Sequence, residues 1–337
     1  MRCPLNTIGL VAIGRNEGDR LQRCLNSVVG QADAVVYVDS GSTDGSVEFA
    51  QSLGVEVVVL DLSIPFTAAR ARNAGFERLL QLQPDLTFVQ FVDGDCEVVP
   101  GWLETARQAL SDRPDLAVVC GRRRERFPEA SIYNQICDIE WDTPVGEATA
   151  CGGDAMMRVA AVQQVNGFNP SLIAGEEPEL CVRLRQQDWK IFRLDADMTL
   201  HDAQMTQFSQ WWKRSQRSGH AFAQGSWMHG RSPQQHWVKE SRRIWIWGLV
   251  IPVVILGTAG ITSGFSLLLL ALYPVSALRT ARYAQGKGYE PGVARWYGWF
   301  CTVGKFPELQ GQLQFHLRRI FHRQATLIEY KSAPSSR

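Results

Sequence analysis

The sequence has almost no excess of charge of either sign. Its 337 residues include 35 lysines and arginines and 34 aspartates and glutamates. Proteins that bind nucleic acid usually carry a basic excess, so the balance excludes nucleic acid as the main partner. The eight cysteines are scattered and form no Cys-x-x-Cys pair. They predict reduced, mostly buried thiols, as in cytosolic proteins, and no disulfide framework.

Targeting segments and internal repeats are missing as well. The N-terminus has no basic region followed by an apolar stretch and a small-residue cleavage site, so we expect no signal peptide. Only the tail, residues 331–337, has the composition of a disordered segment. The length fits one large α/β domain with an appendage, or two ordinary domains.

Apolar runs alternate with amphipathic segments at the start of the chain. Residues 7–13, 34–38 and 55–60 are predicted strands, and helical spacing of apolar residues follows the first two. This alternation predicts right-handed crossovers and a mainly parallel, Rossmann-like sheet flanked by helices. The fold class is therefore α/β.

A fourth apolar run, residues 87–92, leads directly into Asp93-Gly94-Asp95. Both carboxylates would emerge at the carboxyl end of a buried strand, where open α/β sheets bind ligands. Two close carboxylates repel unless a positive group neutralises them, and a hard divalent cation does so while leaving room for phosphate oxygens. The pattern indicates a metal-bridged diphosphate. The alternative is a turn that ends the strand, since Asp-Gly is a common turn pair.

Two other polar segments suit the same ligand. Residues 39–45 can present backbone N–H groups and side-chain oxygens to a nucleoside, or can cap a helix. Arg70 and Arg72 fall at the start of a predicted helix, whose positive end disfavours them unless an anion lies nearby. A diphosphate would supply that anion. The alternative is that both arginines are solvated on an exposed turn.

Together these segments resemble the family 2 glycosyltransferases, which have the GT-A fold. The resemblance covers about the first two thirds of the chain. The segments that carry it are residues 15–17, 38–45, 70–75, 93–95, 150–155, 167–168, 175–180 and the strand ending at His201. It implies an inverting enzyme that uses a nucleotide-diphosphate sugar and Mg²⁺ or Mn²⁺.

The resemblance also implies roles for single residues. Asp39 would contact the nucleotide base, and Asp93 and Asp95 would hold the metal, with Asp95 the more direct ligand. His201 matches a further metal ligand, although a lone histidine after a strand is more often a hydrogen-bonded core residue. The remaining residues expected to bind the donor are Ala12, Asn16, Glu17, Ser40, Arg70, Arg72, Asn73, Gly94, Gly153 and Asp154.

Glu177 is the expected general base. Family members usually have Glu-Asp where this chain has Glu176-Glu177, and the aspartate takes the proton of the acceptor hydroxyl. The longer carboxylate of Glu177 can accept the same proton, and Glu176 is the second candidate. The alternative is that both acids only stabilise the positive end of a helix that begins after Gly175.

A basic run and an apolar segment remain. Residues 120–127 are expected to form a solvated loop, with binding of an anionic lipid or acceptor as the alternative. Residues 244–278 carry no charge and are interrupted by glycine and proline. One straight helix of that length would overshoot a bilayer core that needs about 20 residues. Arginines flank both ends, which predicts that both stay cytoplasmic.

We therefore expect a hairpin or re-entrant pair of helices that turns near residues 257–264. A buried helical pair is the alternative. Further along, residues 306–321 predict an amphipathic helix with arginines near its end, which suits an anionic membrane face or docking on the catalytic domain. The predicted parts are a GT-A catalytic domain (1–230), a hydrophobic hairpin (231–282), an amphipathic helical region (283–330) and the tail.

The predicted activity is transfer of a hexosyl group to a lipid-linked or polysaccharide acceptor at the cytoplasmic face of the inner (plasma) membrane. A sugar nucleotidyltransferase is one alternative, but it would need a glycine-rich basic loop that residues 14–18 match poorly. A membrane-anchored protein that binds nucleotide sugar without turnover is the other.

Overall fold

The computed structural model describes residues 6–322, and these divide into two compact units. The sheet unit comprises residues 6–127 and 141–203, and the helical unit comprises residues 128–140 and 204–322. The chain therefore passes between the units more than once. The domain boundaries predicted at residues 230 and 282 stay predictions. The tail predicted at residues 331–337 lies outside the described residues.

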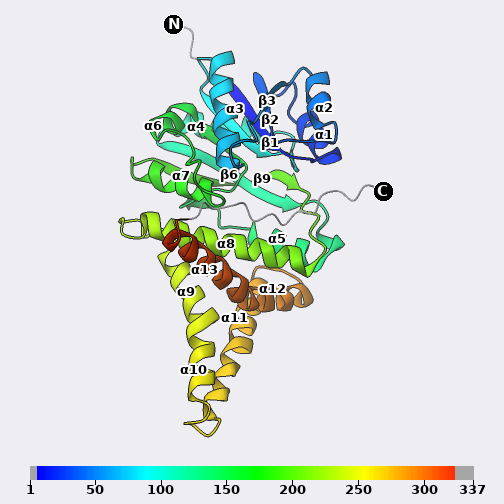
Figure 1. Cartoon of the computed structure of the whole chain (residues 1–337). Helices are drawn as coiled ribbons and strands as arrows, with labels where there is room; N and C mark the ends of the chain where they lie inside the picture. The colour runs from blue at the N-terminus through cyan, green and yellow to red at the C-terminus, as the bar shows by residue number, and fades with distance from the viewer. Residues whose placement is uncertain (1–5, 323–337) are drawn as a thin grey trace. The chain divides into compact units, whose positions relative to one another are not determined.

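One sheet of nine strands organises the sheet unit (Figure 1), with the order β3-β2-β1-β4-β8-β6-β9-β5 and with β7 paired to β9. Strands β1 to β4 pair in parallel, whereas β8 is antiparallel to both β4 and β6. The strands are β1 (Ile8–Gly14), β2 (Ala34–Asp39), β3 (Glu56–Val59), β4 (Phe88–Asp93), β5 (Cys96–Val98), β6 (Leu116–Glu125), β7 (Gly146–Ala148), β8 (Ala155–Arg158) and β9 (Lys190–His201). The mixed sheet confirms the predicted α/β fold class, and each of the four predicted strands lies within one residue of its expected bounds.

Both faces of the sheet are covered. Successive residues Leu10, Val11 and Ala12 of β1 have no exposed surface, as expected for parallel strands with helices on both sides. Helix α3 packs on β1 and β2. The helices of this unit are α1 (Asp19–Asn26), α2 (Ser46–Ser52), α3 (Ala68–Leu82), α4 (Trp102–Asp112), α6 (Val159–Gln164) and α7 (Glu176–Arg185). The cysteines of the described residues are unpaired and mostly buried, as predicted.

The parallel register brings the polar motifs to one edge. Gly14 of β1 lies beside Asp39 of β2, and Ile13 of β1 lies beside Asp93 of β4. The loops that follow these three strands therefore leave the sheet at the same edge. This is the carboxyl edge, where ligands of such sheets bind.

The expectation of a solvated loop at residues 120–127 is wrong. Strand β6 continues to Glu125, because its charged second half pairs with β9 over Arg123 to Thr199 and Glu125 to His201. Its charged side chains reach partners within the protein, so the strand does not need an apolar sequence there.

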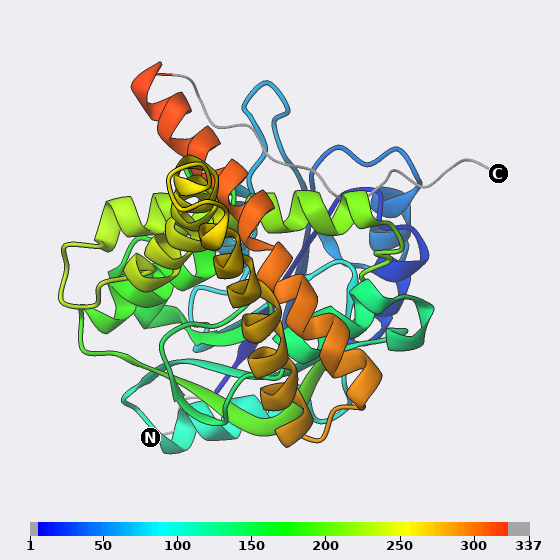
Figure 2. The same ribbon diagram turned by 90° about the horizontal axis from the view of Figure 1, so that it is seen from below.

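The helical unit contains a layer of crossing helices (Figure 2). Helix α13 packs against α8, and α12 packs against α11. At the first of these crossings a Cβ on Gly219 or on Gly311 would collide with the backbone of the opposite helix, so both positions need glycine. The elements are η1 (Pro128–Ala130), α5 (Ile132–Glu140), α8 (Phe208–His229), α9 (Val238–Trp245), the π-helical segment η2 (Ile246–Val250), α10 (Ile251–Thr258), the 3₁₀ helix η3 (Phe265–Ala271), α11 (Leu272–Gly286), α12 (Pro291–Val303) and α13 (Lys305–Ile320).

A helical hairpin extends from this layer (Figure 1). Helices α9 and α10 run continuously through η2, the chain turns at residues 259–264, and η3 returns beside α10 and leads into α11. Among the described residues one helix, Val238–Thr258, is long and apolar enough to cross a membrane. Leu256 is 75% exposed and Ile261 is 87% exposed. The two arms are therefore not the buried pair that was the alternative.

Candidate active site

Arg72 joins three carboxylates at the carboxyl edge of the sheet. It comes from α3, and its Nη2 lies 2.7 Å from Asp93 Oδ1 and 2.9 Å from Glu177 Oε1. Its Nη1 lies 2.7 Å from Glu176 Oε1. The arginine is only 2% exposed, and a buried charge needs such partners. The anion that the sequence predicts beside this arginine is thus supplied by the protein's own side chains.

Glu177 has the properties of a proton acceptor. It lies at the start of α7, just after Gly175, whose φ of 79° is in the left-handed region. Burial raises the pKa of Glu177 to about 7 although Arg72 lowers it, and the neighbouring carboxylates of Glu176 and Asp93 raise it further. A carboxyl group that titrates near neutral pH can take a proton from a hydroxyl and release it again.

Arg123 joins Asp93 to Asp154. Its Nη2 lies 3.1 Å from Asp93 Oδ2, and its Nε donates to Asp154 Oδ2 at 2.9 Å. Asp154 is fully buried and also accepts hydrogen bonds from the Thr199 hydroxyl at 2.6 Å and the Asp93 N–H at 3.0 Å. A Cβ on Gly153 would collide with Asp93 Oδ2, so glycine is needed for this close approach. The buried Asp154 carboxylate therefore holds Asp93 and Arg123 in place.

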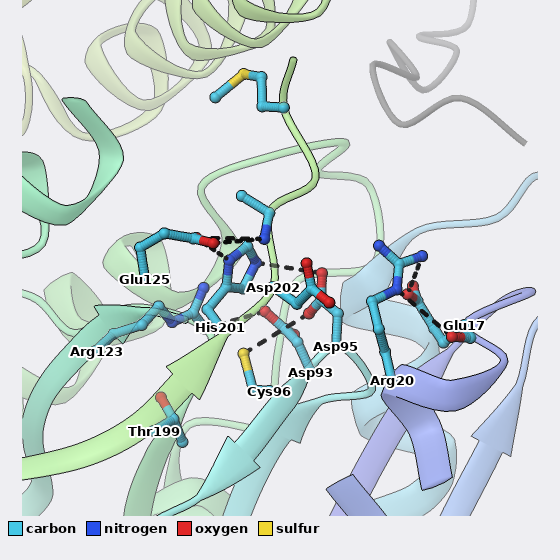
Figure 3. Close-up of polar contacts among 12 residues, drawn as sticks. Glu17, Arg20, Asp93, Asp95, Cys96, Arg123, Glu125, Thr199, His201 and Asp202 are labelled. Atoms are coloured by element: carbon cyan, nitrogen blue, oxygen red, sulfur yellow. Dashed lines mark hydrogen bonds and ion pairs between the residues drawn. The ribbon is translucent and has the colours of Figure 1, made fainter. Parts of the chain in front are cut away.

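His201 lies between two carboxylates (Figure 3). Its Nε2 is 3.2 Å from Asp95 Oδ2, and its Nδ1 is 3.4 Å from Glu125 Oε2. Burial on its own would lower the pKa of His201, but Asp95 and Glu125 outweigh burial and hold it above the usual 6.5. The ring of Trp141 packs edge-on against the imidazole at 4.8 Å.

The donor atoms around Asp95 fit a divalent cation. Ligand atoms of Asp95, Cys96 and His201 lie within 4.8 Å of one another. A carboxylate oxygen and an imidazole nitrogen suit Mn²⁺, whereas burial raises the pKa of the Cys96 thiol well above its usual value and keeps it protonated. Asp95 and His201 therefore fit as metal ligands. Asp93, the third predicted ligand, pairs with Arg72 and Arg123, and its ligand atom also lies within 4.8 Å of those of Cys96 and Asp154.

The loop after β2 is fixed by hydrogen bonds that are accepted by two residues predicted to bind the nucleotide sugar. Asp39 is buried and accepts from the Gly41 N–H at 2.8 Å, the Ser42 N–H at 2.9 Å and the Tyr37 hydroxyl at 3.0 Å. Asn16 Oδ1 accepts from the Thr43 N–H at 2.8 Å. The loops after β1 and β2 are thereby tied together, and Ser40 is buried next to Asp39.

Three predicted residues surround the end of β1. Ala12 is buried between β2 and β4, and the Gly94 N–H donates to the Ile13 carbonyl at 2.8 Å. Glu17 forms an ion pair with Arg20 at 2.7 Å. These contacts order the loop that precedes α1.

Two other predicted residues point away from the carboxylates. Arg70 donates to the carbonyls of Asp61, Ile64 and Pro65 and so holds its own loop. Asn73 exchanges hydrogen bonds with the backbone of Phe168, both at 2.8 Å. The structure therefore gathers Arg72 with the acidic residues, but not Arg70 or Asn73.

Arg123 and Glu125 were missed in the sequence. The sequence does contain a signal for them, because side chains along a strand alternate between its two faces. Arg123 (15% exposed) and Glu125 (0%) lie on one face, and Arg124 (42%) lies on the other. The apolar run at residues 116–120 could have been extended on this period. This alternation was overlooked because a run of arginines is typical of a solvated surface.

Known proteins resemble both the sequence and the fold. Residues 11–163 match the family described as Glycosyl transferase family 2. Glycosyltransferase AglE from Haloferax volcanii is 27% identical over 173 residues, which are 48% of this chain and 55% of AglE. An uncharacterized glycosyltransferase from Rickettsia bellii is 50% identical over 52 residues, 15% of this chain and 18% of its own. The match thus spans about half, or less, of the length of these relatives.

A solved structure shows the same fold over most of the chain. Mannosyltransferase PcManGT from Pyrobaculum calidifontis, in complex with GDP-Man and Mn²⁺, superposes with a TM-score of 0.61. The comparison covers 93% of this chain and 88% of that one, at 16% identity. At this identity the likeness is one of fold.

Proposed function

We propose that this chain, in which residues 11–163 form a family 2 glycosyltransferase domain, transfers a sugar from a nucleotide diphosphate to an acceptor hydroxyl with inversion. The acceptor is a lipid-linked sugar or a polysaccharide, and the site faces the cytoplasm. The fold shared with PcManGT, which is in complex with GDP-Man and Mn²⁺, supports a nucleotide-sugar donor and a divalent cation. The exposed apolar hairpin supports action at a membrane.

The observation that carries this proposal is the guanidinium of Arg72. It binds Asp93, from the motif expected at the donor diphosphate, and Glu177, the expected base. The buried guanidinium of Arg72 therefore fixes the distance between Asp93, where the diphosphate would depart, and Glu177, where the proton would be removed. Holding the reacting groups in position is a large part of catalysis, because they then need not meet by diffusion.

The residues then divide the reaction between them. Glu177 accepts the proton of the acceptor hydroxyl while the acceptor oxygen forms its bond to the anomeric carbon, and the nucleotide diphosphate leaves with the electrons of the broken bond. Asp95 and His201 would hold a divalent cation, which supplies positive charge at the departing diphosphate when bound. Arg72 and Arg123 keep Asp93 oriented, and Asp39 keeps the nucleoside loop in shape.

Two variants test the proposal on purified protein with a panel of nucleotide sugars. Asp95→Ala should lose the Mn²⁺-dependent thermal stabilisation by nucleotide diphosphate that wild-type protein shows, since a ligand at about 100 times its Kd adds roughly 2.7 kcal/mol. Glu177→Gln should keep that stabilisation and lose transfer by about 100-fold or more, the usual contribution of a general base.

Glu179→Gln is the matched control. Glu179 lies on the same helix and is as buried as Glu177, but it pairs with Arg183 at 2.8 Å. Its variant should transfer at the wild-type rate. Wild-type transfer by Glu177→Gln would remove Glu177 as the base, and folded protein that no nucleotide stabilises would contradict the whole proposal.

A further inference from the structure

The surface of the helical hairpin is apolar and carries no charge from Ile244 to Leu278. Side chains that are at least two-fifths exposed occur on both arms and at the turn: Val250, Val253, Val254, Leu256, Ile261, Phe265, Leu267, Leu268, Leu269, Leu270, Val275 and Leu278. Soluble proteins rarely expose so large a continuous apolar surface, and such surfaces mark contact with a membrane or a protein.

The arms are short for a bilayer. The helix Val238–Thr258 has 21 residues, but its first residues include Lys239, Arg242 and Arg243. Its uncharged part begins at Ile244 and is about 22 Å long at 1.5 Å per residue. The hydrocarbon core of a bilayer is about 30 Å thick. The uncharged part of this arm therefore falls short of the far headgroups.

Three hydroxyls and a backbone N–H near the turn of the hairpin have hydrogen-bond partners within it. The hydroxyls of Thr258, Thr262 and Ser266 donate to the carbonyls of Val254, Thr258 and Ile255, at 2.7, 2.8 and 2.9 Å. The Gly264 N–H donates to the Ala259 carbonyl at 2.8 Å, as in a Schellman motif. Polar groups that face water do not need internal partners, whereas polar groups in hydrocarbon do. These four groups therefore need no hydrogen bond from water, which suits a hydrocarbon environment.

The base of the hairpin has the opposite character. Arg242 and Arg243 precede the uncharged segment, Arg279 and Arg282 follow it, and all four are exposed. One or two helical turns further into the hairpin, Trp247 and Tyr273 pack edge to face at 5.6 Å, and the Tyr273 hydroxyl donates to the Trp247 carbonyl at 2.7 Å. Aromatic residues beside basic ones are typical of the headgroup layer, where anionic lipids attract arginine.

We infer that the hairpin enters an anionic bilayer from one side, turns within the hydrocarbon at residues 259–264 and returns to the same side without crossing. The occupant of its apolar surface is lipid, because the basic residues at its base complement anionic headgroups and the hydroxyls of Thr258, Thr262 and Ser266 are satisfied without water. This inference rests on the proposed action at a membrane and adds the way in which the chain is held there.

Accessibility of the turn to a membrane-impermeant maleimide tests the inference in the full chain. Ile261→Cys should stay unlabelled in both inside-out and right-side-out vesicles of expressing cells and become labelled in detergent. Gln285→Cys, exposed on α11 beyond Arg282, should be labelled in one vesicle type only. The parent chain gives the background from its own cysteines. Labelling of Ile261→Cys from the face opposite Gln285→Cys would show a spanning hairpin and overturn the inference.

Arginine substitutions test the lipid contact. Leu268→Arg should weaken sedimentation with phosphatidylglycerol vesicles by about 100-fold, the cost of an arginine held in hydrocarbon. Leu82→Arg, on the last residue of α3 and 42% exposed, should not. Unchanged sedimentation of Leu268→Arg, or a lipid-free dimer that Leu268→Arg dissociates, would contradict lipid as the occupant. Nucleotide-dependent stabilisation of the same samples reports on the proposed function separately.

Discussion

Three carboxylates contact one arginine at the candidate active site, and the pKa of one of them, Glu177, is shifted. Asp93 also pairs with Arg123, whereas Glu176 and Glu177 are both buried and both contact the guanidinium of Arg72. Glu177 shows the consequence, because burial raises its pKa to about 7. Proton transfer to this residue is therefore available close to neutral pH.

The first prediction is the pH dependence of transfer. With the donor saturating, kcat/KM for the acceptor should fall about tenfold for each pH unit below about 7, because the protonated Glu177 cannot accept another proton. Glu177→Gln should show a low rate without this dependence. A wild-type profile that is flat from pH 5 to 8 would show that another group, or no group, takes the proton.

The raised pKa of Glu177 also affects the stability of the folded protein. Low pH weakens transfer, but it favours the folded state. The folded protein binds the Glu177 proton more tightly than the unfolded chain, whose glutamate titrates near 4.5. The resulting stabilisation is fully present below pH 4.5 and is lost as the pH rises through about 7. The Tm of wild-type protein relative to Glu177→Gln should therefore decrease across this window.

Glu125 is the subject of a third prediction at this scale. Its carboxylate lies 3.4 Å from His201 Nδ1 and accepts from the Ala203 N–H, which leaves Nε2 directed at Asp95. Carboxylates in this position orient metal-ligating histidines, and their loss costs about 10–100-fold in metal affinity. Glu125→Gln should weaken Mn²⁺ binding, measured by electron paramagnetic resonance, to that extent. Glu147→Gln, an exposed glutamate of β7, is the control, and equal affinities in the two variants would contradict the role.

At the scale of elements, strands β1, β2 and β4 were predictable because each is largely buried and reads as a continuous apolar run, and the half-buried edge strand β3 was predictable from its run of valines. The end of β6 was not, because its charges are neutralised by Asp93, Asp154 and His201, which are distant in sequence. The position of Arg72 in a helix correctly indicated a nearby anion. The identity of the anion depended on tertiary contacts, because Glu176 and Glu177 follow Arg72 by more than 100 residues.

The α8–α13 crossing gives a prediction for an element. An alanine in place of a helical glycine normally stabilises by about 1 kcal/mol. At Gly219 the added Cβ would collide with the backbone of Glu308, and overpacking of this kind typically costs 1–3 kcal/mol. Gly219→Ala should therefore lower the Tm of detergent-solubilised protein. Gly286→Ala, at a helical glycine with open space around it, should leave the Tm unchanged or raise it. A Gly219→Ala protein as stable as Gly286→Ala would show that the helices can separate without cost.

At the scale of the whole molecule, the sequence indicated a catalytic α/β part followed by helical segments, but not that an early segment belongs to the helical unit. Residues 128–140 leave the sheet after β6 and contribute α5 to the helical unit. There Tyr133 packs edge-on against Phe300 at 5.5 Å, and Glu140 pairs with Arg214 at 2.7 Å. The sequence near residues 128–140 does not predict either contact, because both partners, Phe300 and Arg214, come after residue 203.

This discontinuity has a consequence for biosynthesis. Helix α5 leaves the ribosome well before Phe300 has been made, and at about 5–20 residues per second the interval is roughly ten seconds or more. During that time α5 has been synthesised but its partner in α12 has not. The nascent chain therefore cannot complete its units one after the other, and α5 remains without its partner until α12 has been synthesised.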